Sequence, residues 1–153
     1  MPDYGLTDDP PLPWEWARYR LERSSDYWLS TVRSNGAPHL VKVWGVWTDR
    51  DDFVFSGAPT SVKIRNVQRV PRASVGTEDG DEMVVVEGSV IELTSDRVPG
   101  FIAAYNVKYD VLDPGWGTID DSFGPFWLLS PQRAFGCIET DHRFTATMTR
   151  WTW

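Results

Sequence analysis

The chain is poor in the residues that build disulfides and metal sites. Its 153 residues include one cysteine and two histidines. A lone Cys137 excludes an internal disulfide and fits a reducing cytoplasm, and its apolar neighbours indicate a buried, inert thiol. No Cys/His cluster has zinc-like spacing, and neither a G-x-S-x-G elbow nor a P-loop occurs. We therefore expect no metal site and no nucleophilic mechanism.

An excess of positive charge is also lacking. Lys and Arg number 15 against 22 Asp and Glu, which gives a net charge of −7. Nucleic-acid binding relies on clustered basic residues that release counterions, so we expect no nucleic-acid partner. No stretch approaches the length of a transmembrane helix, and the acidic, proline-rich start lacks the basic and apolar regions of a signal peptide. These absences predict a cytoplasmic protein with no membrane partner.

The residues that are present suffice for one hydrophobic core. Hydrophobic side chains make up 41% of the chain, without a second composition regime or a repeat. This predicts a single domain over residues 1–153, with residues 1–12 as a flexible arm. Pro13 suits the first position of a helix over residues 13–24. The apolar, β-branched runs of residues 27–57 then predict a three-strand meander.

The second half of the chain continues this mainly β pattern. A short helix is expected to start at the potential caps Thr60 and Ser61 and to stop before Pro71. Two strands follow, then a helix with Pro99 in its first turn. The runs "PFWLLSP", "RAFGCIE" and "FTATMTRWTW" are typical of strands. Short turns between consecutive strands favour an antiparallel sheet closed into a small barrel, with helices packed on its ends.

One segment, "SGAPTSVKIRNVQRVPRASV", is locally basic within this acidic chain. A helix N-terminus offers unpaired N–H groups and partial positive charge, so Thr60, Ser61 and Lys63 are placed to bind a phosphate. The same spacing also fits an ordinary cap followed by a solvated basic face. Lys42 interrupts an apolar strand and either faces solvent or meets an anionic or polar ligand.

Aromatic residues are frequent near this segment and at the chain end. Those before the basic segment can wall a planar ring or fill a barrel: Trp44, Trp47, Phe53 and Phe55. Trp151 and Trp153, beside Arg150, are unusual for a frayed tail. A docked end, against a second subunit, would explain them and indicates a dimer.

Taken in order, these segments resemble the pyridoxamine 5′-phosphate oxidase-like flavin and deazaflavin oxidoreductases. The resemblance rests on "WLSTVRSNGAPHLVKVWGVW", "DDFVFSG", "TSVKIRNVQRVPRASV", "VVVEGSVIEL" and "TATMTRWTW", and covers nearly the whole chain from Trp14 onward. Its most specific piece is the K-x-R-N element followed by x-P-R. It implies an antiparallel FMN-binding split β-barrel, mainly β with short helices, and a homodimer that holds its cofactor at the interface.

The resemblance also implies positions for a cofactor. Residues 39–44 would run along the ring edge, Ser56 and Gly57 would end the third strand beneath the ring, and the next segment would take the phosphate. Arg150 and Trp151 resemble a terminal segment brought to the active site by the same or the partner subunit. The predicted cofactor-binding residues are thus His39, Val41, Lys42, Val43, Trp44, Ser56, Gly57, Thr60, Ser61, Lys63, Arg65, Arg150 and Trp151.

The implied activity is hydride transfer between FMN or the deazaflavin coenzyme F420 and a small organic substrate. Extra basic residues, namely Arg65, Arg69 and Arg72, would suit the anionic tail of F420 unless the protein's own carboxylates pair with them. Relatives often carry proline where Lys42 stands. The residues with which true pyridoxamine 5′-phosphate oxidases grip their substrate's phosphate have no match here, so vitamin B6 oxidation is not expected.

No acid-base constellation is required, because the ring itself carries the hydride. The catalytic residues therefore stay unassigned, although His39, Tyr105 and Tyr109 are candidates to donate a proton or to shape the ring pocket. The loop over residues 111–124, with its Trp116, is a candidate wall for the substrate. Two other functions stay open: a non-catalytic flavin- or haem-binding split barrel, and a lipocalin-like carrier without a nucleotide.

Overall fold

A computed structural model describes residues 10–112, 114 and 118–153. Its elements are α1 (Trp14–Arg23), β1 (Tyr27–Val32), β2 (Pro38–Val43), β3 (Gly45–Trp47), β4 (Phe53–Ser56), α2 (Val62–Arg69), β5 (Arg72–Thr77), β6 (Val84–Glu92), α3 (Val98–Leu112), η1 (Asp121–Phe123), β7 (Phe126–Gly136), η2 (Thr140–His142), α4 (Phe144–Thr147) and β8 (Thr149–Thr152). The three predicted helices correspond to α1, α2 and α3, so they are confirmed. None of the described helices is long and apolar enough to cross a membrane.

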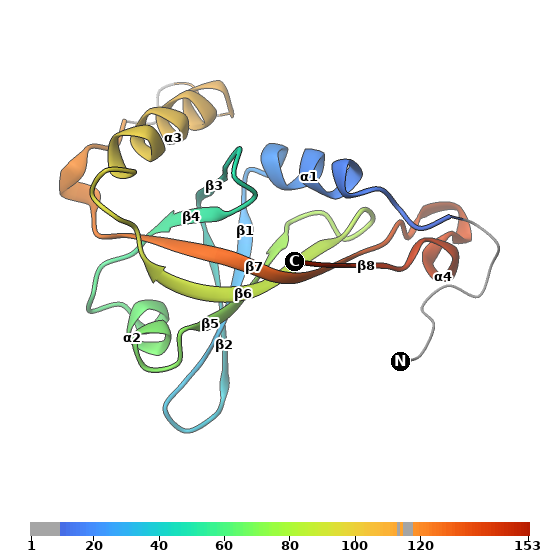
Figure 1. Cartoon of the computed structure of the whole chain (residues 1–153), viewed down its shortest axis with the longest axis horizontal. Coiled ribbons are helices and arrows are strands. Elements are labelled where there is room, and N and C mark those ends of the chain that lie inside the picture. The colour runs from blue at the N-terminus through green and yellow to red at the C-terminus, as the bar shows by residue number, and fades with distance from the viewer. Residues whose placement is uncertain (1–9, 113, 115–117) are drawn as a thin grey trace.

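All the strands belong to one antiparallel sheet. Its order is β2-β1-β5-β6-β7-β4-β3, with β8 paired to β7. β2 and β3 stand at opposite ends of this order, although only Trp44 separates them in the chain. The sheet must therefore curl until its two ends meet at Trp44, which gives a split barrel. Figure 1 shows this curl, with α1 and α3 above the sheet and α2 below it. The predicted mainly β fold with helices on its ends is confirmed.

The predicted three-strand meander is wrong at its second strand. The structure divides that strand into β2, which pairs with β1, and β3, which pairs with β4. The division falls at Trp44 and Gly45, where the chain bends from one edge of the sheet to the other. A Cβ atom on Gly45 would lie 2.4 Å from the Phe53 ring. Only glycine therefore allows β3 to pack this closely on β4.

The last part of the chain also differs from the prediction. Two predicted strands are one continuous strand, β7, that contains Pro131. Proline cannot donate to a ladder, and here the register with β6 shifts between Glu87 and Gly88, a bulge that accommodates it. The predicted strand "FTATMTRWTW" is helical over its first part, α4, and only β8 pairs with β7.

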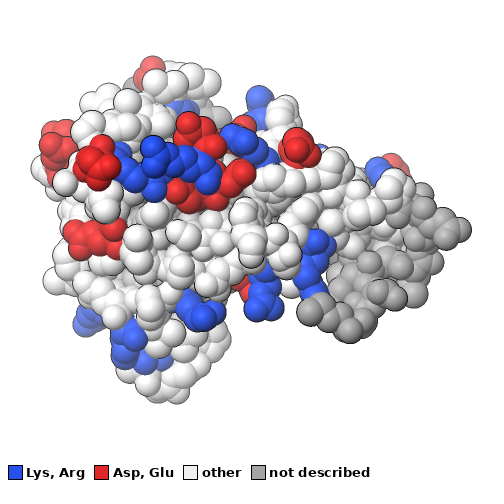
Figure 2. All heavy atoms as spheres, viewed as in Figure 1, with Lys and Arg blue, Asp and Glu red and all other residues white. Residues whose placement is uncertain are grey.

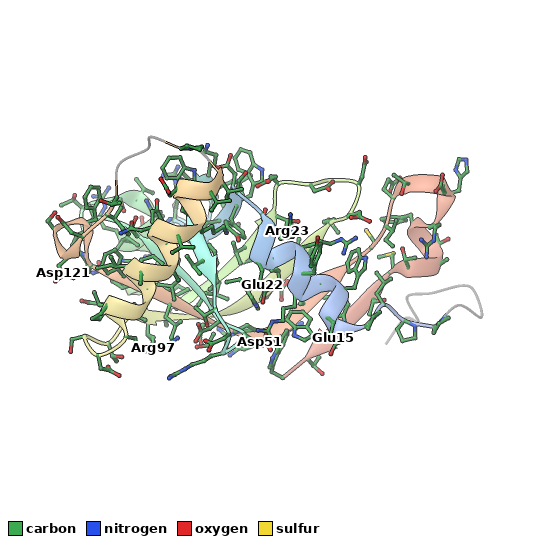
Figure 3. All side chains as sticks on the ribbon, turned by 90° about the horizontal axis from the view of Figure 1, so that it is seen from above. Glu15, Glu22, Arg23, Asp51, Arg97 and Asp121 are labelled. Carbon is green, nitrogen blue, oxygen red and sulfur yellow. The ribbon has the colours of Figure 1, made fainter. Side chains whose placement is uncertain are left out.

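The hydrophobic core has two parts. The larger part lies inside the curled sheet, where α1 and α2 each add buried side chains such as Leu21 and Ile64. The smaller part lies beneath α3 and includes Phe101 and Phe126. Arg97, just before α3, forms a 3.0 Å ion pair with Asp52 beside the β3–β4 turn. Figure 3 shows α1 and α3 on the same face, so both helices cover this end of the barrel.

The residues at the start of α1 pack against the C-terminal strand β8 and Trp153. The amide of Leu12 donates to Thr149 Oγ1 (2.9 Å), and Trp151 Nε1 donates to the Leu12 carbonyl (3.2 Å). Trp14 makes edge-on contacts with Trp151 and Trp153, with ring centroids 5.5 and 4.7 Å apart. The predicted docking of the C-terminal end therefore takes place within this chain. Residues 1–9 of the predicted arm lie outside the described residues.

Candidate functional site

The start of α2 packs closely against the end of β4. A Cβ atom on Gly57 would lie 2.8 Å from Ile64 and 2.9 Å from Cε of Lys63. The carbonyl of Gly57 accepts a 3.0 Å hydrogen bond from Trp127 Nε1, which fixes the backbone here. The close approach places the Lys63 side chain against the end of β4, next to Ser56.

Ser61 occupies the N-cap position of α2, but its side chain does not cap the helix. Its hydroxyl instead donates to the carbonyl of Ala58 at 2.8 Å. Thr60 is exposed in the preceding turn. The predicted side-chain caps are therefore wrong, and the first-turn N–H groups of α2 receive no side-chain cap. Such groups favour an anion at this end of the helix.

A cavity of about 290 Å³ opens beside this corner. Its lining residues come from β2, the bend, β4, α2 and α3: Lys42, Val43, Trp44, Ser56, Lys63 and Tyr105. Apart from Tyr105, each of them is a predicted cofactor-binding residue. The fold thus brings together segments that lie far apart in the sequence. Two cationic side chains and two aromatic side chains share this small space, which suits a planar anionic ligand.

The two lysines of the cavity differ in their partners. Lys42 Nζ forms a 3.0 Å ion pair with Asp26, whose carboxylate also accepts a 2.7 Å hydrogen bond from Trp44 Nε1. Half of the Lys42 side chain is exposed (52%). Lys63 has no carboxylate within ion-pair distance among the described residues, and burial lowers the pKa of its ammonium group. Lys63 is therefore the cation that a ligand can neutralise.

His39 lies on β2 close to α2. Its Nδ1 is 3.3 Å from Thr31 Oγ1, and that hydroxyl accepts a 3.0 Å hydrogen bond from the buried Asn66 amide on α2. Burial, and then the charges of Arg33 and Lys63, lower the pKa of His39. The charge of Lys63 therefore affects the pKa of His39, although His39 does not line the cavity. Its neighbour Val41 is half-buried and packs against the core.

Several predicted residues do not reach the cavity. Arg65 is exposed on α2, Arg150 lies over the Phe135 ring (5.1 Å), and Trp151 packs on Trp14. Within one chain the terminal strand β8 thus lies away from α2 (Figure 1). A role for Arg150 and Trp151 at the cofactor stays a prediction. The predicted substrate wall at Trp116 lies outside the described residues.

The basic face of α2 and β5 is partly engaged by the protein itself. Arg69 Nη2 donates to the Val32 carbonyl (2.6 Å), and Arg72 Nη1 donates to Gln132 Oε1 (3.2 Å). These partners are neutral acceptors and leave the positive charge in place. In Figure 2 basic side chains gather over α2 without acidic ones among them, whereas the opposite edge mixes both signs. A positive field therefore surrounds the start of this helix.

A polar network behind the bend holds Gly45 in place. The carbonyl of Gly45 accepts from Lys108 Nζ (3.0 Å), and its amide donates to the Tyr109 hydroxyl (2.9 Å). Lys108 also donates to the Tyr27 hydroxyl at 2.6 Å, and burial lowers the pKa of Lys108 to about 8. The Trp44 ring stacks on Tyr109 with centroids 5.2 Å apart. Helix α3 therefore positions the aromatic wall of the cavity.

The sequence analysis missed Asp26 and Lys108. Asp26 precedes β1 in the sequence, and only the pairing of β1 with β2 brings it to Lys42 and Trp44. Lys108 follows Tyr105 by three positions, so helical spacing puts the two on neighbouring parts of one face. Cys137 is buried, as predicted, and burial raises the pKa of its thiol. Across the described residues no group of His, Cys, Asp or Glu could hold a metal ion.

Fold and site together define a split β-barrel with a cationic corner and an aromatic wall. The family model of pyridoxamine 5′-phosphate oxidase matches residues 14–111, well over half of the chain. The chain therefore belongs to this family, as the resemblance of its motifs implied. Among curated proteins, none matches the sequence.

Solved structures share the fold at low sequence identity. A heme binding protein from Mycobacterium smegmatis has a TM-score of 0.70 at 21% identity, and the match covers 90% of this chain but 57% of that one. A pyridoxamine 5′-phosphate oxidase-related, FMN binding protein from Nostoc punctiforme has a TM-score of 0.63 at 17% identity, with 93% and 97% covered. An F420 reductase has a TM-score of 0.61 at 22% identity, with 76% and 94% covered. These likenesses establish the split-barrel fold.

Proposed function

We propose that this protein binds FMN or coenzyme F420 in the cavity beside α2 and serves as an oxidoreductase for a small organic substrate. The observation that carries the proposal is Lys63. Its ammonium group is half-buried, has no carboxylate partner in the described part of the chain and lies beside two aromatic side chains. A partly buried cation of this kind is costly unless an anion completes its surroundings.

The residues present fit such a cofactor. Lys63 and the uncapped first turn of α2 bind the phosphate through charge-assisted hydrogen bonds. Trp44 lies along the ring, and Lys42, held by Asp26, adds positive charge at the edge of the cavity. When bound, the ring supplies hydride transfer. The chain itself orients the ring and excludes water from it. The relatives known as an FMN binding protein and an F420 reductase support both cofactors.

We also infer that the working unit is a homodimer. The outer face of β1 and β2 exposes three apolar side chains, Trp28 (46%), Val32 (42%) and Leu40 (61%). They lie on paired strands, so they form one apolar surface that a second copy would cover. In such a dimer the partner's terminal segment, equivalent to Arg150 and Trp151, would complete the cofactor site. The single buried thiol is consistent with the cytoplasm as location.

A parallel titration of the protein with FMN and with F420, followed by fluorescence quenching, tests the proposal. Lys63→Ala should weaken binding of the true cofactor by about 1.5 to 3 kcal/mol, the range for hydrogen bonds to a charged group. Arg50→Ala, which removes an exposed charge from the β3–β4 turn, is the matched control and should bind normally. Wild-type protein that binds neither cofactor would overturn the proposal.

A second candidate is a non-catalytic module that stores or senses haem or a flavin. It is favoured by the likeness to the heme binding protein, which has a TM-score of 0.70. Turnover separates the two functions, because only an oxidoreductase exchanges hydride between the bound ring and an added substrate at a steady rate. A carrier without any nucleotide would in addition show no effect of Lys63→Ala on ligand affinity.

A further inference from the structure

Three tyrosines are buried in the corner formed by α1, the bend and α3. Tyr27 donates from its hydroxyl to the Leu21 carbonyl and accepts a hydrogen bond from Lys108. The Tyr109 hydroxyl accepts from the Gly45 amide and donates to the Ser25 carbonyl, both at 2.9 Å. The Tyr105 hydroxyl, by contrast, has no hydrogen-bond partner anywhere in the described residues. The residue is only 6% exposed.

Tyr105 is held rigidly by its neighbours. Its ring centroid lies 4.4 Å from that of Tyr109 and 5.7 Å from that of Phe101, one helical turn away on either side. The side chain cannot turn to solvent without breaking this stack. It lines the cavity together with Trp44, Ser56 and Lys63. Tyr105 thus lines the candidate cofactor site, and its hydroxyl makes no hydrogen bond to the described residues.

The ring of Tyr105 is buried, but its hydroxyl oxygen is not one of the buried polar atoms that lack a partner in the described residues, so it can be reached from the cavity. Replacing this tyrosine by phenylalanine would keep the packing of the ring and remove a polar atom from the cavity. The hydroxyl is therefore free to bond to a ligand without breaking a hydrogen bond to the described residues. Burial raises the pKa of Tyr105 to about 12, so the group is a hydrogen-bond donor at neutral pH.

We propose that the Tyr105 hydroxyl donates a hydrogen bond to a carbonyl oxygen of the planar ring that binds in this cavity. This inference rests on the proposed function and specifies the chemical groups that the ligand must carry. The ligand carries an anionic group for Lys63, an extended ring for Trp44 and a carbonyl oxygen for Tyr105. Flavin and deazaflavin rings both have such oxygens. Tyr105 is therefore a residue that recognises the ring, whereas Tyr109 is a structural residue on the same helix.

The test compares Tyr105→Phe with Tyr109→Phe, which remove the same atom one helical turn apart. FMN and F420 are titrated into each variant by fluorescence quenching, and the absorption band of the bound ring is recorded. Thermal unfolding of the ligand-free proteins is measured alongside. Tyr105→Phe should leave the midpoint of unfolding unchanged, because the hydroxyl makes no hydrogen bond to the described residues, and should bind the cofactor about twofold to tenfold more weakly. In this variant, the absorption band of the bound ring should also lose the shift that a hydrogen bond to the ring carbonyl causes.

Tyr109→Phe should show the opposite pattern, with a lowered midpoint of unfolding and the band shift retained, because its hydroxyl bonds only to the protein. If wild type binds a cofactor and Tyr105→Phe matches it in both affinity and absorption band, the Tyr105 inference is wrong while the proposed function stands. If wild type binds neither FMN nor F420, the proposed function and this inference both fail.

Discussion

The polar groups on the two sides of the Trp44–Gly45 bend have different surroundings. Behind the bend, Lys108 and Tyr109 are fully engaged with the backbone of Gly45. In front of it, Lys63 and Tyr105 line a cavity and have no protein hydrogen-bond or ion-pair partner within the described ranges. The rear side thus resembles an ordinary buried network that stabilises the fold. The front side presents polar groups to a cavity, where a ligand can bind them.

The strongest way to disturb the rear side is to add an atom at the bend itself. Gly45→Ala would place a Cβ 2.4 Å from the Phe53 ring and 2.6 Å from the Val54 carbonyl. Because neither can move far in the core, the free energy of unfolding should fall by about 3 kcal/mol. Urea unfolding measures the change. Gly100→Ala on α3, where a Cβ would meet nothing within 4 Å, should stay within about 1 kcal/mol of wild type.

The buried lysine of the rear network predicts a pH dependence of stability. Burial lowers the pKa of Lys108 from 10.5 to about 8, so between these values the unfolded chain binds more protons than the folded one. Stability due to this group therefore rises with pH over that interval. The difference in unfolding free energy between wild type and Lys108→Met should increase by about 2 kcal/mol from pH 7 to pH 10. A flat difference would contradict the buried position of the ammonium group.

The two cavity lysines allow a comparison on the front side. Lys42 is half exposed and already paired with Asp26, whereas Lys63 has no such partner among the described residues. Lys42→Ala should therefore weaken cofactor binding by less than about 1 kcal/mol, the usual worth of an exposed pair. Lys63→Ala should have the larger effect. Isothermal titration of both variants with the same cofactor measures the difference, and equal losses would show that the pairing with Asp26 is irrelevant to binding.

The smallest expected effect is a shift of the His39 pKa. The positive charge of Lys63 contributes to holding this pKa low, so an anion bound at Lys63 should raise it. An NMR pH titration with and without cofactor measures the shift, and the exposed His142 serves as an internal control. A His39 pKa that stays constant while the cofactor is bound would place the phosphate elsewhere.

Local sequence patterns predicted the helices and most strands. Pro13 and Pro99 marked the starts of α1 and α3, and apolar, β-branched runs between turn residues marked β1 and β6. Thr60, Ser61 and Lys63 were predicted to bind a phosphate; of these, the structure places Lys63 at the cavity, and phosphate binding stays a prediction. The correct helix and strand predictions share one cause, since each signal lies within a few residues of the element that it describes.

The errors arose where distant segments decide the local structure. The break at Trp44 depends on the Phe53 ring and on α3, and the continuity of β7 through Pro131 depends on a bulge in β7 where it pairs with β6. Lys42 pairs with Asp26, and Lys108 donates a hydrogen bond to the carbonyl of Gly45. The spacing of residues along the sequence does not predict such contacts, because they form only after the sheet has curled.

The sequence by itself determined the family, the mainly β class and the basic character of the segment that forms α2 and the start of β5. Hydrophobic periodicity and turn residues act over short distances, so they can be read along the chain. The tertiary structure alone decided which cavity lysine has a carboxylate partner, which tyrosine hydroxyl bonds to the described part of the protein and where the aromatic wall stands. Burial and pairing are properties of the assembled neighbours. The distinction between Lys42 and Lys63, and between Tyr105 and Tyr109, therefore exists only in the folded chain.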